Sequence, residues 1–109
     1  MKTNKIIAEF MGYKVMTESQ FDSATTPLPE NIMIHEAMHY HDDWSELMPV
    51  VERIESLGYS VCIEKNVIEI FDQSEELIFG TFAPTKIQST YNAVVRFIEG
   101  NVGFTQFNT

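Results

Sequence analysis

The clearest pattern along the chain is an apolar stripe over residues 44–57, in which hydrophobic side chains recur every three or four positions. Asp43 and Glu46 form a capping box before this stripe, and Gly58 follows it as a C-terminal cap would. Pro49 lies inside the stripe and should bend or loosen the first turns, because it removes one helix hydrogen bond. The pattern predicts a helix with one apolar face. That face comprises Trp44, Leu47, Met48, Val51, Ile54 and Leu57.

Two further amphipathic stretches predict a helix near each end of the chain. Residues 4–11 place their apolar side chains on one short helical stripe. Residues 85–99 carry a longer stripe, which begins at a second capping box formed by Thr85 and Gln88 and ends at Gly100. The apolar residues of this last stripe are Ile87, Tyr91, Val94, Val95 and Ile98. Tyr91 is therefore most simply a packing residue.

Between the two longer helices, the period of the pattern changes from helical to alternating. Residues 59–64 and 67–71 alternate between apolar and other side chains, and a tight turn at 65–66 separates them. A polar loop at 72–76 leads to a third strand at 77–82. Because the connections between consecutive strands are short, the three strands should form an antiparallel meander.

Together these elements predict an α+β fold. It has an N-terminal helix followed by helix, three-stranded antiparallel meander and helix, with the helices packed on the sheet. A length of 109 residues and a hydrophobic content of 44% predict a single domain over residues 1–109. A polar loop is predicted at about 17–31 and a flexible tail at 102–109. Residues 13–16 are read as extended, and residues 32–40 are either a helical turn or an irregular segment.

The segment 40–59, YHDDWSELMPVVERIESLGY, resembles the first helix of the phage ABA sandwich domain, a family of small phage and prophage proteins. The segment 85–98, TKIQSTYNAVVRFI, is similar to the second helix of that family, and the whole resemblance runs from about Tyr40 to Glu99. The chain departs from the family in Pro49, in a longer N-terminal extension and in the few alanines of its last helix. The family has no assigned activity, cofactor or catalytic residue. The resemblance therefore implies a fold and a phage or prophage context, and no mechanism.

The charge of the chain is strongly acidic and uneven. The formal net charge is −9, and residues 18–76 hold fourteen acidic and two basic side chains, a local charge of −12. Such a surface repels phosphate backbones, so we expect no nucleic-acid binding. It attracts a basic protein partner, or imitates nucleic acid in a phage protein, or only keeps a small domain in solution. The oligomeric state is left open.

The sequence gives no sign of a membrane or redox role. No apolar run reaches the roughly 20 residues that a membrane span requires, so no membrane association is expected. The single cysteine, Cys62, has no internal disulfide partner and no basic neighbour that would activate its thiolate. A cytoplasmic location is expected.

One pentapeptide, H-E-A-M-H at 35–39, matches the H-E-x-x-H pattern of zinc metallopeptidases. On a helix, His35 and His39 would share a face and hold a zinc ion, while Glu36 would deprotonate the metal-bound water. A third ligand is hard to assign, because Asp42 stands where the longer form of the motif has a glycine. The remaining candidates for this ligand are Glu52, Glu55 and Glu64, none of them at a persuasive spacing.

A second polar cluster lies just before the helix predicted at 44–57. It consists of His39, His41, Asp42 and Asp43. The cluster is able to bind a divalent ion, but a polar helix entrance whose aspartates cap the first turn explains the same residues. Trp44 is either an exposed anchor for a partner or, as its place on the apolar stripe favours, a core residue. Glu52 and Glu55 fit an acidic solvent face of the helix.

Two functional hypotheses remain. The sequence favours a small, acidic, non-enzymatic domain, a phage- or prophage-type accessory or protein-interaction protein without a cofactor. The alternative is a small zinc metallohydrolase that uses His35, Glu36 and His39, with zinc as its cofactor. Metal content separates them, because stoichiometric zinc that disappears in a His39→Ala variant would favour the hydrolase.

Overall fold

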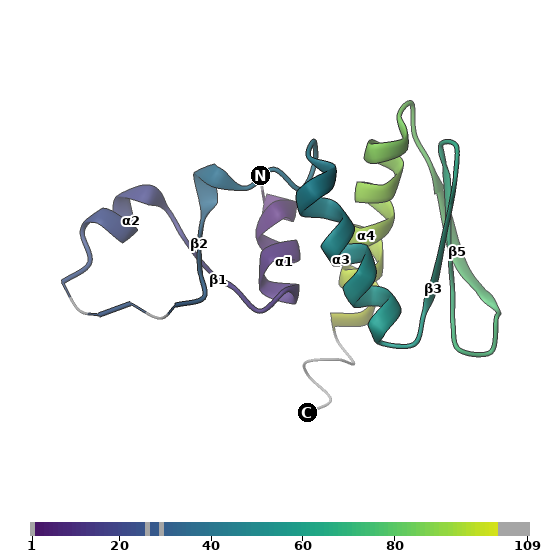
Figure 1. Ribbon diagram of the computed structural model, residues 1–109, viewed down its shortest axis with the longest axis horizontal. Coiled ribbons are helices and arrows are strands. Elements are labelled where there is room, and N and C mark those ends of the chain that lie inside the picture. The colour runs from purple at the N-terminus through teal and green to yellow at the C-terminus, as the bar shows by residue number, and fades with distance from the viewer. Residues whose placement is uncertain (1, 26, 29, 103–109) are drawn as a thin grey trace.

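Two helices lie on one face of a three-stranded antiparallel sheet, as the computed structural model shows (Figure 1). The structure describes residues 2–25, 27–28 and 30–102. In chain order, the elements are α1 (Lys2–Phe10), β1 (Lys14–Met16), α2 (Glu18–Asp22), β2 (Ile32–Ile34), the 3-10 turn η1 (His35–Ala37), α3 (Trp44–Ser56), β3 (Ser60–Glu64), β4 (Val67–Phe71), β5 (Leu77–Phe82) and α4 (Lys86–Val102).

The predicted α+β class and the order helix, meander, helix are confirmed. Helix α3 contacts β3, and α4 contacts both β4 and β5, so the two helices together cover one face of the sheet. Helix α1 packs on α4 from the side that faces away from the sheet (Figure 1). Its buried Ile7 and Ala8 join the same core. The meander order β3-β4-β5 leaves β3 and β5 as the two edges of this sheet.

Alternation along the strands decides which side chains face the helices. The inner face buries Ile68 and Ile70 of the central strand and half-buries Val61, Ile63 and Phe79 of its neighbours. These residues form one layer because the register places Val61 opposite Ile70, which in turn lies opposite Phe79. The opposite side chains of the same strands point away from both helices.

Helix α3 begins as predicted at its cap residue, but the capping box is incomplete. The Asp43 carboxylate accepts hydrogen bonds from the amide of Ser45 at 2.8 Å and from its hydroxyl at 2.6 Å. Glu46 does not return to the Asp43 amide, as a capping box requires. Its carboxylate accepts instead from the amide of His39, at 2.8 Å. The side chain of Glu46 therefore fastens the helix to the segment that precedes it.

The predicted core position of Trp44 is wrong. Its side chain is 36% exposed, while the buried residues of α3 are Leu47, Val50, Val51 and Ile54. The buried face of the helix is centred on these four residues, and Trp44 lies at the edge of that face. Leu57, the other end of the predicted stripe, is exposed as well. The helix continues through Pro49, which is itself exposed.

The Asp43 cap makes a specific prediction for the pH dependence of stability. Hydrogen bonds from the hydroxyl and the amide of Ser45 lower the pKa of the Asp43 carboxyl below its ordinary value of 3.8. Because the folded-state pKa is the lower one, this contribution is complete above pH 3.8 and is lost as the pH falls through the folded-state pKa. As the pH is lowered from about 5 to about 3, the urea midpoint should therefore fall more in the wild type than in Asp43→Asn.

The Asp43→Asn variant is the matched control, since asparagine also caps helices but does not titrate in this range. The remaining carboxyl groups are the same in both proteins, and their effect cancels in the comparison. Equal shifts of the two midpoints would show that the hydrogen bonds of Asp43 contribute nothing that depends on its charge.

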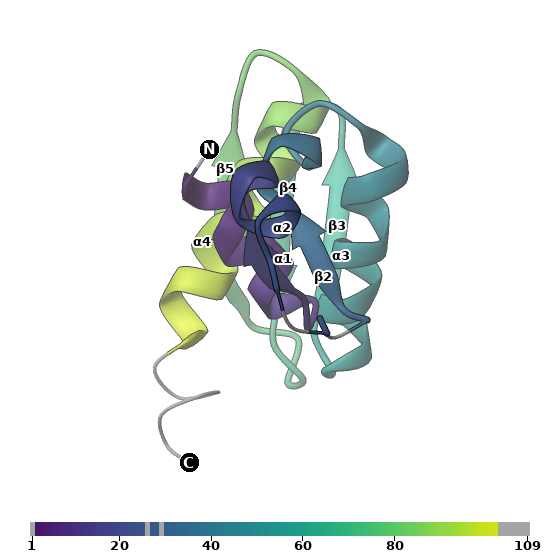
Figure 2. The same ribbon diagram turned by 90° about the vertical axis from the view of Figure 1, so that its left-hand side faces the viewer.

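The N-terminal third contains structure that the predicted polar loop at 17–31 did not include. Helix α2 occupies part of it, with a complete capping box in which the Thr17 hydroxyl accepts from the Gln20 amide and the Gln20 side chain accepts from the Thr17 amide. The extended segment at 13–16 is confirmed as β1, which pairs in parallel with β2. Figure 2 shows these elements on the side of α1 that faces away from the sheet.

The C-terminal helix also differs from its predicted end. Helix α4 continues through Gly100 to Val102. A glycine costs a helix about 1 kcal/mol relative to alanine, which does not suffice to end it. Of the predicted tail at 102–109, residues 103–109 lie outside the described residues.

Candidate functional site

The H-E-A-M-H segment does not form the helix on which its zinc chemistry depends. His35 begins the 3-10 turn η1, and Met38, which ends it, has the extended dihedral angles φ −82° and ψ 130°. The zinc site of this motif needs its two histidines one turn apart on the same face of an α-helix. The backbone of residues 35–39 therefore does not place His35 and His39 on one helical face.

Glu36, the proposed catalytic base, has a structural contact instead. Its carboxylate accepts a hydrogen bond of 2.9 Å from the backbone amide of Glu18, the first residue of α2. This hydrogen bond is the main cause that lowers the pKa of the Glu36 carboxyl. Glu36 thus joins η1 to the start of α2 across the parallel strands β1 and β2. A lowered pKa keeps the group ionised and makes it a weaker base.

Two histidines and an aspartate do come together, but they are His39, His41 and Asp42. Their nitrogen and oxygen ligand atoms lie within 4.8 Å of one another. Nδ1 of His39 is 3.2 Å from one carboxylate oxygen of Asp42, and Nε2 of His41 is 3.5 Å from the other. The two imidazole rings stack with centroids 5.9 Å apart. Among the described residues, Glu52, Glu55 and Glu64 do not join this group.

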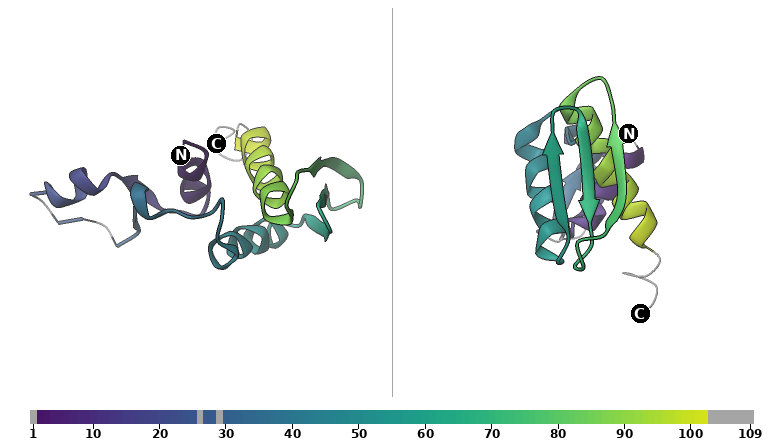
Figure 3. Two further views of the ribbon diagram at one scale, coloured as in Figure 1. Left: turned by 90° about the horizontal axis from the view of Figure 1, so that it is seen from above. Right: turned by 90° about the vertical axis from the view of Figure 1, so that its right-hand side faces the viewer.

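The exposed outer face of the sheet is the second candidate site. Viewed from the right-hand side of Figure 1, strands β3, β4 and β5 lie in front of both helices, with no other described element over them (Figure 3, right). The register aligns three rows of outward side chains across this face: Glu64, Val67 and Phe82; Cys62, Glu69 and Gly80; Ser60, Phe71 and Leu77. We refer to these nine residues as the outer face.

The outer face combines large apolar side chains with carboxylates. Phe82 is 75% exposed, and Val67 and Leu77 are also exposed, as is Ile78 beside them on β5. Glu64 and Glu69 stand among them, so the same surface carries negative charge. Exposed apolar clusters of this kind mark interaction sites more often than isolated apolar residues do.

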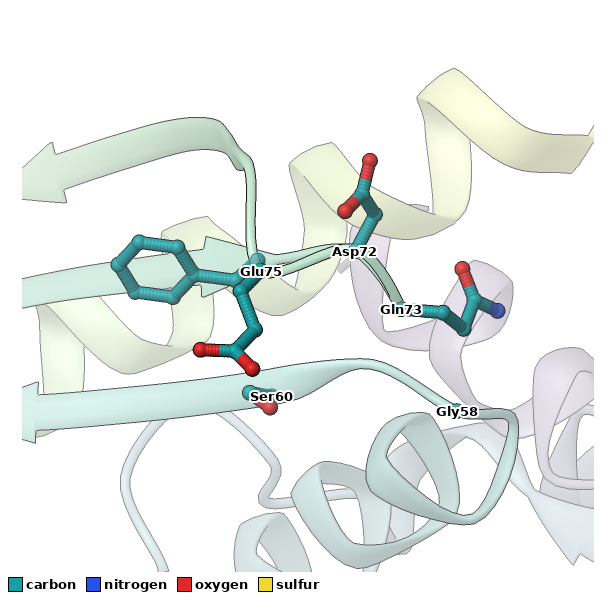
Figure 4. Close-up of a pocket in the computed structure, with 6 residues that line it drawn as sticks. Gly58, Ser60, Asp72, Gln73 and Glu75 are labelled. Carbon is teal, nitrogen blue, oxygen red and sulfur yellow. The ribbon is translucent and has the colours of Figure 1, made fainter.

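A hollow of about 410 Å³ lies at the end of the outer face, where the β4–β5 loop approaches the start of β3. Figure 4 shows the Glu75 carboxylate directed toward Ser60 on β3. Glu75 adopts a positive φ of 64°, which is uncommon for a residue other than glycine. The loop is held in this form by Asp72, whose carboxylate accepts from the amides of Ser74 and Glu76.

The outer face was not among the sites predicted from the sequence. Trp44 was the one possible apolar anchor among those predictions, although Phe82 is far more exposed. A signal was present in β5, whose sequence LIFGTF is apolar at positions that alternation sends to both faces. Cys62 is exposed on the outer face, while Tyr91 is buried in α4, as its assignment to packing predicted.

Comparison with known proteins gives no relative of this chain. No family model, no curated protein and no solved structure matches it. Within the part of the chain that the structure describes, no helix has both the length and the apolar character needed to cross a membrane.

Proposed function

We propose that the protein is a non-enzymatic protein-interaction domain that binds a partner protein through the outer face. The proposal assigns no catalytic residue and no cofactor to this activity. The observation that carries it is the exposure of Phe82, which is 75% accessible at the end of β5 although the strand is still paired with β4 there. Val67 lies directly opposite Phe82 across the strands and extends the apolar surface.

The charge of the outer face indicates the chemistry of the partner. Glu64 and Glu69 lie within the apolar rows, and Glu75 borders the adjoining hollow. A second copy of this chain would bring the carboxylates of two such faces together and add its own net charge of −9. Like charges across an interface are unfavourable. The matching partner is therefore a basic protein surface that presents apolar side chains flanked by lysine or arginine.

Two further features support the proposal. The resemblance of residues 40–99 to the phage ABA sandwich domain supports an accessory role of the phage or prophage kind. The exposed thiol of Cys62 on the outer face suits a reducing compartment, so we propose that the protein acts in the cytoplasm. The excess of carboxylates also makes nucleic acid an unsuitable partner.

Selection from a displayed library of random peptides tests the proposal. The selected peptides should pair apolar residues with lysine or arginine, because both kinds of group are complementary to the outer face. Phe82→Ser should weaken their binding at least about tenfold, as expected for the main aromatic anchor of an interface. Phe21→Ser is the matched control, since Phe21 is also exposed but lies on α2, away from the sheet. It should change binding by no more than about twofold.

Three results would contradict the proposal. The first is a set of selected peptides whose binding is equally sensitive to both serine variants. The second is a preference for acidic peptides. The third is sedimentation that shows a dimer which Phe82→Ser dissociates, because the occupant of the face would then be a second copy of the chain.

A further inference from the structure

We propose that His39, His41 and Asp42 form a binding site for one divalent transition-metal ion, a site separate from the outer face. Two imidazoles and a carboxylate are the ligands that Zn²⁺ and its neighbours Co²⁺, Ni²⁺ and Cu²⁺ accept. The group shares only His39 with the H-E-x-x-H motif. His35 and Glu36 take no part, so the site is distinct from that of a zinc peptidase.

The ligand atoms need only a small adjustment to hold an ion. Zinc–ligand bonds of about 2.0–2.1 Å at tetrahedral angles separate neighbouring ligand atoms by about 3.3 Å. Here the ligand atoms lie within 4.8 Å of one another, and Nδ1 of His39 is already 3.2 Å from the Asp42 carboxylate. The side chain of His39 is exposed and can therefore adjust its position.

The backbone that carries the three ligands is held in place on both sides. The carbonyl of His39 accepts from the amides of Asp42, at 3.2 Å, and of Asp43, at 2.9 Å, which closes a tight turn. Tyr40 lies between the two histidines in the sequence and is buried. This burial raises the pKa of its hydroxyl to about 12. The turn leaves His39 exposed and His41 partly exposed, so both imidazoles lie beside the Asp42 carboxylate at the surface.

A buried amide behind His41 is the second, independent feature of the site. Asn4 is 1% exposed, and its Nδ2 lies 3.1 Å from Nδ1 of His41. Its Oδ1 accepts from the hydroxyl of Tyr91 at 2.9 Å, and the same hydroxyl is hydrogen-bonded to Thr3. Histidines that bind metals are typically oriented by such a partner on the other ring nitrogen.

The amide can serve either protonation form of the His41 ring. As described, Asn4 donates to Nδ1, which leaves the ring proton on Nε2. A half-turn of the amide reverses both bonds: Oδ1 then accepts a proton from Nδ1 of His41, and Nδ2 donates to Tyr91. Tyr91 can in turn donate to Thr3, so every buried group keeps a partner. This second arrangement frees Nε2, beside Asp42, for the metal.

Three protein ligands leave the coordination of a zinc ion incomplete. Structural zinc sites have four protein ligands, whereas sites with three keep a position for water. The exposed position of His39 and Asp42 makes that remaining place accessible from solvent. We therefore expect a reversible, solvent-accessible ion and not one on which folding depends.

Titration of the untagged protein with ZnCl₂ alone, followed by calorimetry, tests the site. One equivalent of Zn²⁺ should bind. The His39→Ala and His41→Ala variants should each lose at least about tenfold in affinity, since even changes to residues that only hydrogen-bond a metal ligand cost that much. His35→Ala is the matched control and should stay within about twofold of the wild type. Tyr91→Phe, which removes the hydroxyl that positions Asn4, should lose about tenfold without touching a ligand.

A spectroscopic readout separates coordination from loose attraction to an acidic surface. Long-range proton–nitrogen spectra of the imidazoles should move the His41 ring proton from Nε2 to Nδ1 on addition of Zn²⁺. Binding that is lost equally in His35→Ala would overturn the proposal in favour of the H-E-x-x-H motif. No Zn²⁺ binding, or binding that survives the joint His39→Ala and His41→Ala substitution, would also overturn it. None of these outcomes bears on peptide binding at Phe82, so the two proposals fail separately.

Discussion

Replacing Phe97 by alanine is expected to lower the free energy of unfolding by about 3–5 kcal/mol. The ring is 1% exposed and joins three parts of the fold. It meets the ring of Tyr59, just before β3, edge to face at 4.8 Å, and that of Phe10, in α1, edge to face at 6.3 Å. Its removal leaves a cavity at the point where α1, α4 and the segment that leads into β3 meet. Urea unfolding, followed by far-ultraviolet circular dichroism, measures the loss of stability.

Phe82→Ala provides the matched control. The same atoms are removed, but from a side chain that is 75% exposed, so the change should stay within about 0.5 kcal/mol. If Phe97→Ala does not fold, Phe97→Leu should still be measurable at about 1.5 kcal/mol. Equal costs at positions 82 and 97 would contradict the arrangement, because they would mean that the outer face is packed in the free protein.

Most of the main body follows from patterns that are local in sequence. Helices α3 and α4 have one-sided apolar stripes and cap residues such as Asp43 and Thr85, whose hydroxyl does accept from the Gln88 amide. The strands alternate, and their connections are short enough to leave only antiparallel pairing between neighbours. Where the patterns are local and the connections are short, the sequence determines both the elements and the order in which they pack.

The predictions from the sequence are wrong where contacts between residues far apart in the chain determine the structure. Trp44 fits the periodic stripe, but α3 turns toward Val50 because β3 and α4 pack there. Helix α2 has no buried residue and so leaves no apolar period, although the capping box of Thr17 and Gln20 was a readable sign. The predicted capping box paired the Glu46 carboxylate with the amide of Asp43, whereas it accepts from the amide of His39, seven residues away.

For the candidate sites too, local patterns could be read from the sequence and distant contacts could not. The H-E-A-M-H pattern presupposes an α-helix, but buried Met38 and Tyr40 alternate with His39 and His41, and the structure has a 3-10 turn followed by an extended Met38. That alternation was visible in the sequence. The contact between His41 and Asn4 was not, because it joins residues 37 positions apart and depends on how α1 packs.

The second large effect is expected at Asn4, whose replacement by alanine should cost about 2–3 kcal/mol. The change removes the hydrogen-bonding partner of both Tyr91 and His41 and leaves a small cavity beside them. Tyr91→Phe removes one hydroxyl from the same network and should cost about 1 kcal/mol. Asn92→Ala, one residue further along α4 and exposed, is the control and should be neutral within about 0.5 kcal/mol.

The double variant distinguishes a network from two unrelated packing defects. Asn4 and Tyr91 are 87 residues apart in sequence and join α1 to α4 through one hydrogen bond. If that bond stabilises the pair, Asn4→Ala with Tyr91→Phe should cost less than the sum of the single changes, by about 1 kcal/mol. The reason is that the second substitution removes a group already left without its partner. Additive costs, measured by urea unfolding of all four proteins, would show that Asn4 stabilises α1 by filling space alone. The amide would then lack the hydrogen bond through which Tyr91 holds it beside His41.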